Sequence, residues 1–470
     1  GTRVKQIVPI MDFMRGELST SAEGRVDREE FIHGAKVIEN MVVTETGGVK
    51  RRPGTKFIMD AADSGNSKSR LIPFVAKNGE QFLFEFTNAA VRVLEDDSSN
   101  GWQAAGTKYT TLDLGSTLTN EPSVGDWVFT MQGDWRALLM KTVTSKRKWE
   151  LSQPQGTVGD DGTNINYMFP KEEFAKAKAA TGIVTTNTLA ASATVHVQNG
   201  LSLYTEAQLD DIQWVQLERG LILTHPSHPP LFMEYGDKDH FTLRELGFPT
   251  GVPDIDTNTD LDTVKLSHGW YTEHKTFVDS GENDKSFRLI AYERDAAKDP
   301  GTSGWDTIWG LPHMGQIAFD TNGPRACGFF AGRLVLGGSS AEPATLWFST
   351  PYEPDDFAVG PYDDSAMKVT LSSENGEAIQ WIAGGENLIV GTNYSEWIVT
   401  GNSPSTLQAK RISAYGSATI PARILGPTML FFEKDRRRMR EHFFWDAMQA
   451  YQAKDLTDLA RHITEDKPKT

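Results

Sequence analysis

The chain has 470 residues, of which 39% are hydrophobic and 10% aromatic. This length exceeds one ordinary hydrophobic core, so we expect two or three domains, and the apolar content excludes a disordered tail. The formal net charge is −16, from 63 acidic and 47 basic residues. Such a surface disfavours tight binding of nucleic acid, because neutralising phosphates requires clustered Lys and Arg. No stretch is long and apolar enough for a membrane helix, so we expect no membrane insertion by this chain.

The N-terminal region, residues 1–60, predicts an extended arm that ends in a hairpin. Its apolar residues are few and scattered, and Gly and Pro interrupt it. This texture is unlike the first βα unit of an enzyme and is typical of an extended segment with turns. Three segments stand out: Phe13-Met-Arg-Gly-Glu-Leu-Ser19, Gly24-Arg-Val-Asp27 and Glu39-Asn-Met-Val-Val-Thr-Glu-Thr-Gly-Gly-Val-Lys-Arg-Arg-Pro-Gly-Thr55.

A hairpin pattern recurs along the rest of the chain: a short apolar strand, a polar turn and a second strand that carries an aromatic residue. Such runs, bounded by Gly, Asn and Pro, predict antiparallel hairpins. Leu334, Leu388 and Met429 lie 54 and then 41 residues apart, close to the roughly 40–50 residues of one propeller blade. We therefore expect a mostly β, β-propeller-like body, with a β-sandwich as the alternative. The paired strands are 82–86 with 91–94, 221–224 with 231–233, 333–336 with 346–349, 387–390 with 397–399, and 429–432 with 439–441.

Two stretches interrupt the hairpin pattern. Residues 101–203 are rich in Gly, Thr and Asp around short strands, and we expect an inserted small β-rich domain there, on a loop where insertions are tolerated. Residues 254–320 begin polar and then contain the strand-like Phe287-Arg-Leu-Ile-Ala-Tyr292, which suggests a second small β module. The propeller-like body then comprises residues 61–100, 204–253 and 321–470.

Motifs that would identify an enzyme are absent: the sequence has no phosphate-binding Gly-x-x-x-x-Gly-Lys-Ser/Thr loop, no Gly-x-Ser-x-Gly elbow and no His-Glu-x-x-His zinc helix. His225 and His228 have a spacing compatible with metal ligation, but the adjacent prolines favour a plain turn. The alternating acids from Asp254 to Asp262 lack the Gly and Glu of a calcium loop and favour a solvated linker. Cys327, the single cysteine, lies in an apolar stretch and favours a buried thiol. We expect no enzymatic activity, no catalytic residue, no metal site and no cofactor.

Two basic clusters stand out against the acidic chain. Arg436-Arg-Arg-Met-Arg440 falls in a predicted hairpin turn, and Lys50-Arg-Arg52 lies in the arm. Few aromatic residues are interleaved with the first cluster, so nucleic-acid binding is weaker than two other interpretations: a solvated tip, or a clasp on the acidic surface of a neighbouring subunit. We interpret the cluster in the arm as an intersubunit clasp too.

The order of these motifs resembles the tail nozzle proteins of short-tailed bacteriophages of the podovirus type, also called tail tubular or tail hub proteins. Members of that family begin with a Phe and a Gly-Glu-Leu-Ser segment, then Gly-Arg-x-Asp, then Asn, a short strand, Gly-Gly and an Arg-Arg-Pro-Gly-Thr turn. The likeness covers about two-thirds of the chain, and it is poor over 101–203 and 254–320. It continues at Gln81-Phe-Leu-Phe-Glu-Phe86, Leu221-Ile-Leu-Thr-His-Pro-Ser-His-Pro-Pro-Leu231, Ala331-Gly-Arg-Leu-Val-Leu-Gly-Gly-Ser339, Leu346-Trp-Phe-Ser349, Asn387-Leu-Ile-Val-Gly-Thr392, Ala453-Lys-Asp-Leu-Thr457 and Ala460-Arg-His-Ile463.

The resemblance implies a structural virion protein, a propeller-like subunit of a sixfold homo-oligomeric ring that forms a conduit for ejection of viral DNA. The implied partners are the adaptor (head-to-tail connector) protein below the portal, tail fibres or spikes, and DNA that passes through without specific binding. The implied location is the virion tail, after assembly in the host bacterial cytoplasm. Net acidity suits such a channel, and we hypothesise that acidic loops line its lumen. The candidate assembly residues are Phe13, Arg25, Asp27, Arg51, Arg52, Arg436, Arg437 and Arg438.

Aromatic residues at the hairpin ends are candidate interface anchors in such a ring, with core packing as the alternative. Two other functions compete with the nozzle. One is a phage tail propeller that binds or cleaves host-surface glycans, and the absence of repeated Ser-x-Asp-x-Gly-x-x-Trp boxes counts against it. The other is a free β-propeller scaffold, and the Arg-Arg-Pro-Gly-Thr arm counts against that. The aromatic residues are Trp347, Phe348, Trp397, Phe443, Phe444 and Trp445.

Overall fold

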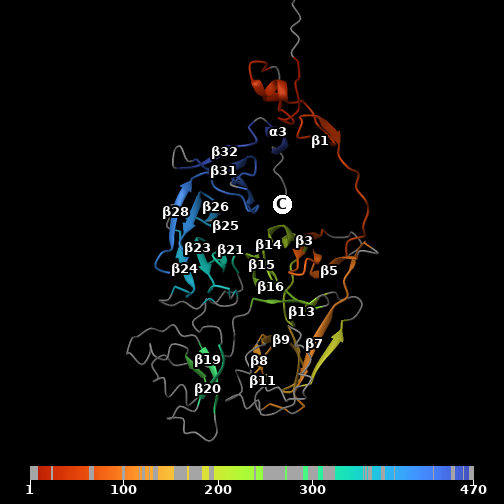
Figure 1. The fold of residues 1–470 in the computed structure, drawn as a ribbon, viewed down its shortest axis with the longest axis vertical. Helices are drawn as coiled ribbons and strands as arrows, with labels where there is room; N and C mark the ends of the chain where they lie inside the picture. Colours follow the sequence, from red (N-terminus) through yellow and green to blue (C-terminus); the bar gives the residue numbers. More distant parts are fainter. Residues whose placement is uncertain are drawn as a thin grey trace, which may run out of the picture.

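The computed structural model is built almost entirely from antiparallel β-sheets (Figure 1). None of the helices in its described part has the length and apolar composition needed to cross a membrane. The structure describes residues 9–22, 25–62, 68–97, 101–115, 117–118, 122–125, 127–130, 136–152, 167–168, 183–189, 195–237, 240–246, 270–272, 289–294, 305–310, 323–352, 354, 357, 363–371, 376–385, 387–426, 428–445, 450–458 and 460–464.

Five sheets share one pattern, a meander of four sequential antiparallel strands, and together form the body. This is the architecture of propeller blades, so the prediction of a mostly β, propeller-like fold is confirmed. Each sheet is named here by its first strand. The β3 sheet contains β3 (Arg70–Val75), β4 (Gln81–Thr87), β5 (Ala90–Asp97) and β6 (Gly101–Ala104); the β14 sheet contains β14 (Gln213–Leu217), β15 (Gly220–His225), β16 (His228–Asp237) and β17 (His240–Glu245), with β13 (His196–Val197) added beside β17; the β21 sheet contains β21 (Ala326–Phe330), β22 (Arg333–Gly337), β23 (Thr345–Phe348) and β24 (Met367–Thr370); the β25 sheet contains β25 (Ile379–Gly384), β26 (Leu388–Thr392), β27 (Glu396–Thr400) and β28 (Gln408–Ser413); the β29 sheet contains β29 (Arg423–Leu425), β30 (Thr428–Phe432), β31 (Met439–Trp445) and β32 (Ala450–Asp455).

The predicted hairpins are the second and third strands of these sheets. They correspond to β4 with β5, β15 with β16, β22 with β23, β26 with β27, and β30 with β31, each pair antiparallel. Leu334, Leu388 and Met429 all lie at the start of a second strand and are buried. Their spacing therefore reports the distance along the chain from one blade to the next.

Neighbouring sheets pack face to face through buried apolar clusters. The β3 and β14 sheets meet at Phe82 and Phe241, whose ring centroids are 4.9 Å apart. Two further clusters join the β14 sheet to the β21 sheet and the β21 sheet to the β25 sheet. Trp381 and Phe431, 5.9 Å apart, join the β25 sheet to the β29 sheet. The cores thus lie between the sheets, as stacked blades require.

Three of the candidate aromatic residues pack in the core, as the core-packing alternative expects. Trp347, Phe348 and Trp397 are buried in the cores between sheets, and the Trp397 indole donates a hydrogen bond to Glu377 at 2.7 Å. Successive side chains along a strand point to opposite faces of its sheet, and both faces of the β21 sheet pack on a neighbouring sheet, so even consecutive large rings are buried there. Phe443 is half-buried, and the side chains at 444 and 445 lie outside the described residues.

The β14 sheet packs directly on the β21 sheet, although residues 247–322 separate them in sequence. The two ends of that segment meet at the turn between β15 and β16. The Leu246 amide donates to the Pro230 carbonyl at 2.8 Å, and a Cβ added to Gly323 would lie 1.9 Å from the His228 carbonyl oxygen. Within the segment, the described residues form a three-stranded sheet of β18 (Trp270–Thr272), β19 (Leu289–Arg294) and β20 (Trp305–Gly310).

A separate six-stranded sheet lies between β6 and β13, at the opposite end of the molecule from the arm (Figure 1). It has its own core around Leu112 and Trp149, which confirms an inserted small β-rich domain. The strands β6 and β13, at the two ends of the predicted range 101–203, pair with strands of the body; the exact domain boundaries stay predictions. The strands, in spatial order, are β11 (Tyr167–Met168), β8 (Trp127–Thr130), β9 (Arg136–Thr144), β10 (Lys148–Leu151), β7 (Lys108–Asp113) and β12 (Ile183–Thr188).

The arm contains two short 3₁₀ helices and the predicted hairpin. β1 (Met41–Val43) pairs with β2 (Val49–Arg51), and Val43 lies opposite Val49. Figure 1 shows the arm beyond one end of the body, next to the C-terminal helix α3. The two helices of the arm are η1 (Thr20–Ala22) and η2 (Glu29–His33), and the described residues also form η4 (Glu206–Asp211) and α3 (Arg461–Thr464).

Candidate functional site

The arm presents an unusual number of apolar side chains to solvent. Scattered exposed apolar residues are normal on any protein, but a concentrated set marks an interaction surface. The arm supplies close to half of the exposed large apolar side chains among the described residues. They are Ile10, Met11, Met14, Val26, Val37, Met41, Val42, Phe57 and Ile58.

The arm is nevertheless folded on itself by local hydrogen bonds. The Phe13 amide donates to the Gly47 carbonyl at 2.8 Å, and Glu17 forms an isolated bridge with Ala35. The Asp12 carboxylate lies 2.7 Å from the His33 ring. The Met14 amide, and then the His33 ring, hold the pKa of Asp12 below its usual value. The surface is therefore presented by a defined conformation.

The candidate residues Arg25 and Asp27 contact one another. Their side chains form a bidentate pair, 2.7 Å apart at the closest atoms, on the exposed surface. The Arg25 hydrogen bonds lower the pKa of Asp27 to about 2. Arg52 donates to the Asn40 side chain at 2.9 Å, while Arg51 ends β2 with its side chain exposed. The Gly-Arg-x-Asp and Arg-Arg-Pro motifs thus fix local structure, and whether they contact a neighbour stays a prediction.

The second basic cluster lies in the turn between β30 and β31, as predicted. Arg436 has a positive φ of 60° and donates to the Thr419 hydroxyl at 2.8 Å. Arg438 lies 3.9 Å from both Glu433 and Asp455. The Arg437 side chain is exposed and has no hydrogen bond or ion pair within the described part of the chain. Of the three, Arg437 is therefore the one whose whole guanidinium group is open to another molecule.

The arm and the C-terminal helix α3 are joined by an ion pair that sequence reasoning did not identify. Glu17 lies 2.8 Å from the His462 ring, and it also accepts from the Ile38 amide at 2.7 Å. These two bonds, the amide first, lower the pKa of Glu17. Thr464 donates to the Arg437 carbonyl at 2.6 Å, so α3 bridges the arm and the basic turn. Both residues lie in motifs noted in the sequence, Gly-Glu-Leu-Ser and Arg-His-Ile, but nothing in the sequence pairs the two motifs.

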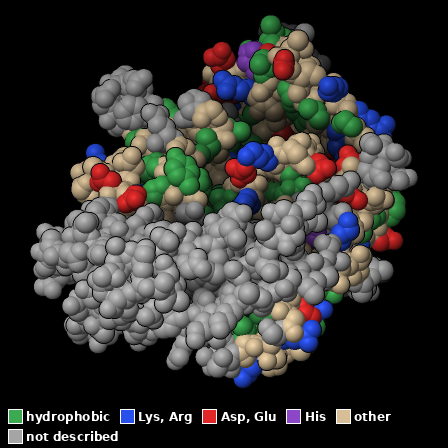
Figure 2. All heavy atoms as spheres, turned by 60° about the horizontal axis from the view of Figure 1, so that its bottom comes forward, with side chains coloured by type: hydrophobic (Ala, Val, Ile, Leu, Met, Phe, Trp, Pro, Cys, Tyr) green, Lys and Arg blue, Asp and Glu red, His purple; other side chains and the backbone are tan. Residues whose placement is uncertain are grey.

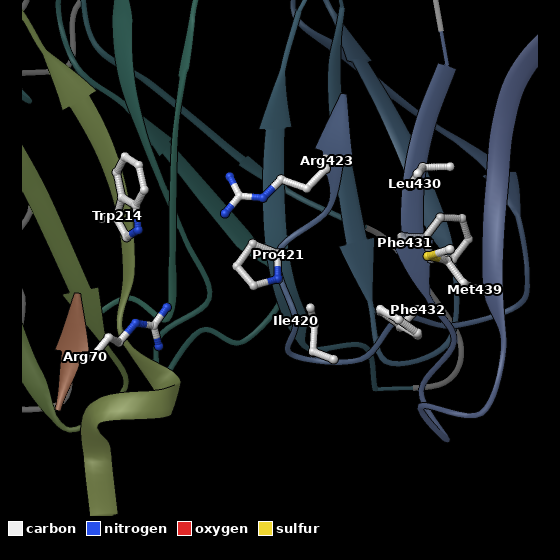
Figure 3. Close-up of a pocket in the computed structure, with 9 residues that line it drawn as sticks. All are labelled: Arg70, Trp214, Ile420, Pro421, Arg423, Leu430, Phe431, Phe432 and Met439. Atoms are coloured by element: carbon white, nitrogen blue, oxygen red, sulfur yellow. The ribbon is translucent and has the colours of Figure 1, made fainter. Parts of the chain in front are cut away.

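A pocket of about 290 Å³ opens where the β29 sheet faces the β3 and β14 sheets. Figure 3 shows the Arg70 and Arg423 guanidinium groups pointing into this space from opposite sides, near Trp214. Arg70 donates to the Leu209 and Asp210 carbonyls at 2.6 and 2.7 Å. Sequence reasoning missed this pocket, since its residues are far apart in the chain. The rest of the lining is Ile420, Pro421, Leu430, Phe431, Phe432 and Met439.

His225 and His228, whose spacing is compatible with metal ligation, are buried at the turn between β15 and β16. Their rings pack at 5.2 Å, and the Ser227 amide donates to His225 at 3.1 Å. His228 bonds the Gln208 side chain at 3.0 Å. Burial lowers the pKa of His225 to about 4, so this ring is neutral at pH 7. No group of three or more metal-ligating side chains occurs among the described residues; Asp254 to Asp262 lie outside them.

Cys327 is buried, as predicted, and burial raises the pKa of its thiol to about 12. A thiol in this environment is a poor nucleophile.

On the surface, basic and acidic side chains are interspersed with one another. Figure 2, seen from the end that carries the inserted domain, shows Lys and Arg mixed with Asp and Glu over the described surface of that face.

No protein-family model matches the sequence, and no curated protein matches it. Among solved structures, a 6-phosphogluconolactonase-like protein from Bacteroides fragilis has 11% identity and a TM-score of 0.26, covering 74% of this chain and 94% of that one. Hsv2 of Kluyvelomyces marxianus has 6% identity and a TM-score of 0.26, covering 83% and 97%. Apo AztD from Citrobacter koseri has 8% identity and a TM-score of 0.25, covering 75% and 83%. Likenesses at this level carry no conclusion about function.

Proposed function

We propose that this chain is a structural subunit of a phage tail nozzle, a homo-oligomeric ring that conducts viral DNA below the portal and its adaptor. The observation that carries the proposal is the arm, whose nozzle-like motifs coincide with a concentration of exposed apolar side chains. An arm that buries these side chains on a neighbouring subunit or on the adaptor gains hydrophobic stabilisation on assembly. On this proposal the protein resides in the virion tail.

Charge supports the same use of the arm. Every residue from Lys50 to Ile58 is exposed, and residues 46–59 contain four basic side chains and no acidic one. The whole chain carries a net charge of −16. A basic segment that extends from an acidic body is complementary to the body of a second copy. Arg437 is exposed beside α3, the helix that contacts the arm, and adds a further positive charge there.

The proposed conduit needs a wall that DNA does not bind. Tight binding of phosphates requires clustered basic side chains, and the described surface in Figure 2 has basic and acidic side chains mixed. We propose that acidic loops line the lumen of the ring, so that DNA passes without specific binding. A ring whose inner wall carries a basic cluster would contradict this part of the proposal.

The test is the mass of the purified full chain in solution, with particle images, alone and with the adaptor. We expect a ring of subunits, and we expect Arg51→Glu with Arg52→Glu to weaken the association at least about tenfold, because like charges then face each other. Arg411→Glu, at an exposed position on β28, is the matched control and should assemble normally. A chain that stays monomeric with and without the adaptor would refute the proposal, and one that binds or cleaves polysaccharide would support the glycan-directed alternative.

A further inference from the structure

The pocket between the β3, β14 and β29 sheets combines two cationic groups with an apolar wall. We infer that it binds a monoanionic carboxylate that carries an apolar group, with the carboxylate between Arg70 and Arg423 and the apolar group between Trp214 and the β29 sheet. The inference does not depend on the proposed nozzle function, because it concerns a cavity within one subunit.

The two guanidinium groups supply the recognition of an anion. Arg70 is half-buried and held in place by its bonds to the Leu209 and Asp210 carbonyls. The Arg423 side chain is exposed and has neither a hydrogen bond nor an ion pair within the described ranges. Burial lowers the pKa of Arg70, and the nearby Arg423 charge lowers it further. Two like charges that face one cavity are stabilised when an anion lies between them.

The surroundings favour one negative charge over two. Asp210 and Asp211 both act on Arg70 electrostatically and favour its charged form. They therefore offset part of the positive field that a dianion, such as a phosphate monoester, would need. Arg and a carboxylate have matching planar geometry, which allows two parallel hydrogen bonds.

The rest of the lining selects for an apolar group. Apart from the two arginines and the Trp214 indole, all the lining residues are apolar. A hydroxyl-rich sugar placed here would leave its hydroxyl groups without partners, which is costly. A volume of about 290 Å³ corresponds to on the order of ten non-hydrogen atoms, since one water occupies about 30 Å³ of liquid. A phenyl ring with a short chain and a carboxylate has this size.

The pocket is pre-formed by the body of the protein. Arg70, Trp214 and Arg423 lie at or next to the first residue of β3, β14 and β29. The Gln213 side chain donates to the Gln380 carbonyl at 2.5 Å and reaches the Thr419 carbonyl at 3.5 Å. These bonds fix the start of β14 relative to the β25 sheet and to the segment before β29. A ligand therefore needs little reorganisation to bind.

The test is titration calorimetry on the full chain with 3-phenylpropionate and, as neutral control, 3-phenylpropanamide. We expect the acid to bind at about 1 mM or tighter and the amide at least about tenfold more weakly. Arg423→Gln should weaken binding of the acid about tenfold and leave binding of the amide unchanged. Arg411→Gln, which removes an exposed arginine outside the pocket, is the matched control and should bind like the unchanged chain.

A second measurement asks whether the carboxylate comes from a small acid or from the carboxyl terminus of a protein. The peptide N-acetyl-Gly-Phe, whose blocked amino terminus leaves the free carboxylate as its only charge, is compared with its carboxyl-terminal amide. Binding of the free peptide would support the inference with a protein carboxyl terminus as the ligand, and binding of 3-phenylpropionate alone would support it with a small acid. Equal binding of acid and amide, unchanged binding by Arg423→Gln, or no binding of either acid would overturn it.

Discussion

The buried ion pair between Glu234 and Arg244 offers a quantitative test of how the β14 sheet is held together. The two side chains are 1% and 0% exposed, with Arg Nε and Glu Oε2 3.0 Å apart. Arg244 also donates to the Glu245 carbonyl at 3.1 Å, and its guanidinium lies over the Phe232 ring at 4.8 Å. Replacing Glu234 with Leu removes the carboxylate that pairs with a buried positive charge.

We expect this single change to lower the free energy of unfolding by about 3–5 kcal/mol. For a folded unit of this size each kcal/mol corresponds to about 2–4 °C, so the melting temperature should fall by about 6–20 °C. Arg244→Met should be similarly destabilising. The double variant should recover most of the loss, because an apolar pair of similar volume avoids the cost of desolvating two charges.

The assay is thermal unfolding of the four members of this double-mutant cycle, followed by near-ultraviolet circular dichroism. Glu342→Gln serves as control, since Glu342 pairs with Lys368 at 2.8 Å on the surface, with both side chains more than two-fifths exposed. An exposed pair of this kind contributes about 0–1 kcal/mol. If Glu234→Leu shifts the melting temperature no more than Glu342→Gln does, or if the double variant is as unstable as the sum of the singles, the reasoning is wrong.

Two further predictions concern single side chains. The Glu17 carboxylate has a pKa below its usual 4.5, because the Ile38 amide and the His462 ring stabilise its charged form. Its contribution to the free energy of unfolding is therefore complete above pH 4.5, and it is lost as the pH falls through the lower pKa of the folded state. Hydrogen-exchange protection of the Ile38 amide should fall over that range and should be low at every pH in Glu17→Ala, which removes the acceptor of that amide; protection that is unchanged in the variant would contradict this. Cys327, buried with a pKa of about 12, should react with a thiol-specific disulfide reagent only in denaturant, and stoichiometric labelling of the native chain would show that the thiol is accessible.

The second and third strands of each blade could be predicted from the sequence because they carry local apolar runs. Leu221 to Thr224 is buried throughout and contiguous, which marks a strand with both faces covered. The first strand of the β29 sheet carries a weaker signal. In β29, Arg423–Leu425 is exposed over its whole length, and no alternation identifies it. This first strand therefore could not be placed without the structure.

The pocket could not be predicted for the same reason. Arg70, Trp214 and Arg423 are separated by more than a hundred residues each, and only the packing order of the sheets brings them together. The arm was more accessible to sequence reasoning, since its Gly-Gly turn and flanking strands are local. What sequence did not show is that Glu17 reaches His462 at the other end of the chain, because a long-range ion pair has no periodicity.

The junction between the β14 and β21 sheets has a consequence for the length of chain that can be inserted there. The chain departs at Leu246 and returns at Gly323 beside one turn, and the two sheets pack across the junction as if the chain had not been interrupted. The entropy of closing a loop grows only slowly with its length, so modules of different size can occupy this position at nearly constant stability of the body. Replacing the segment with a longer or shorter one should therefore leave the blades, their cores and the arm folded.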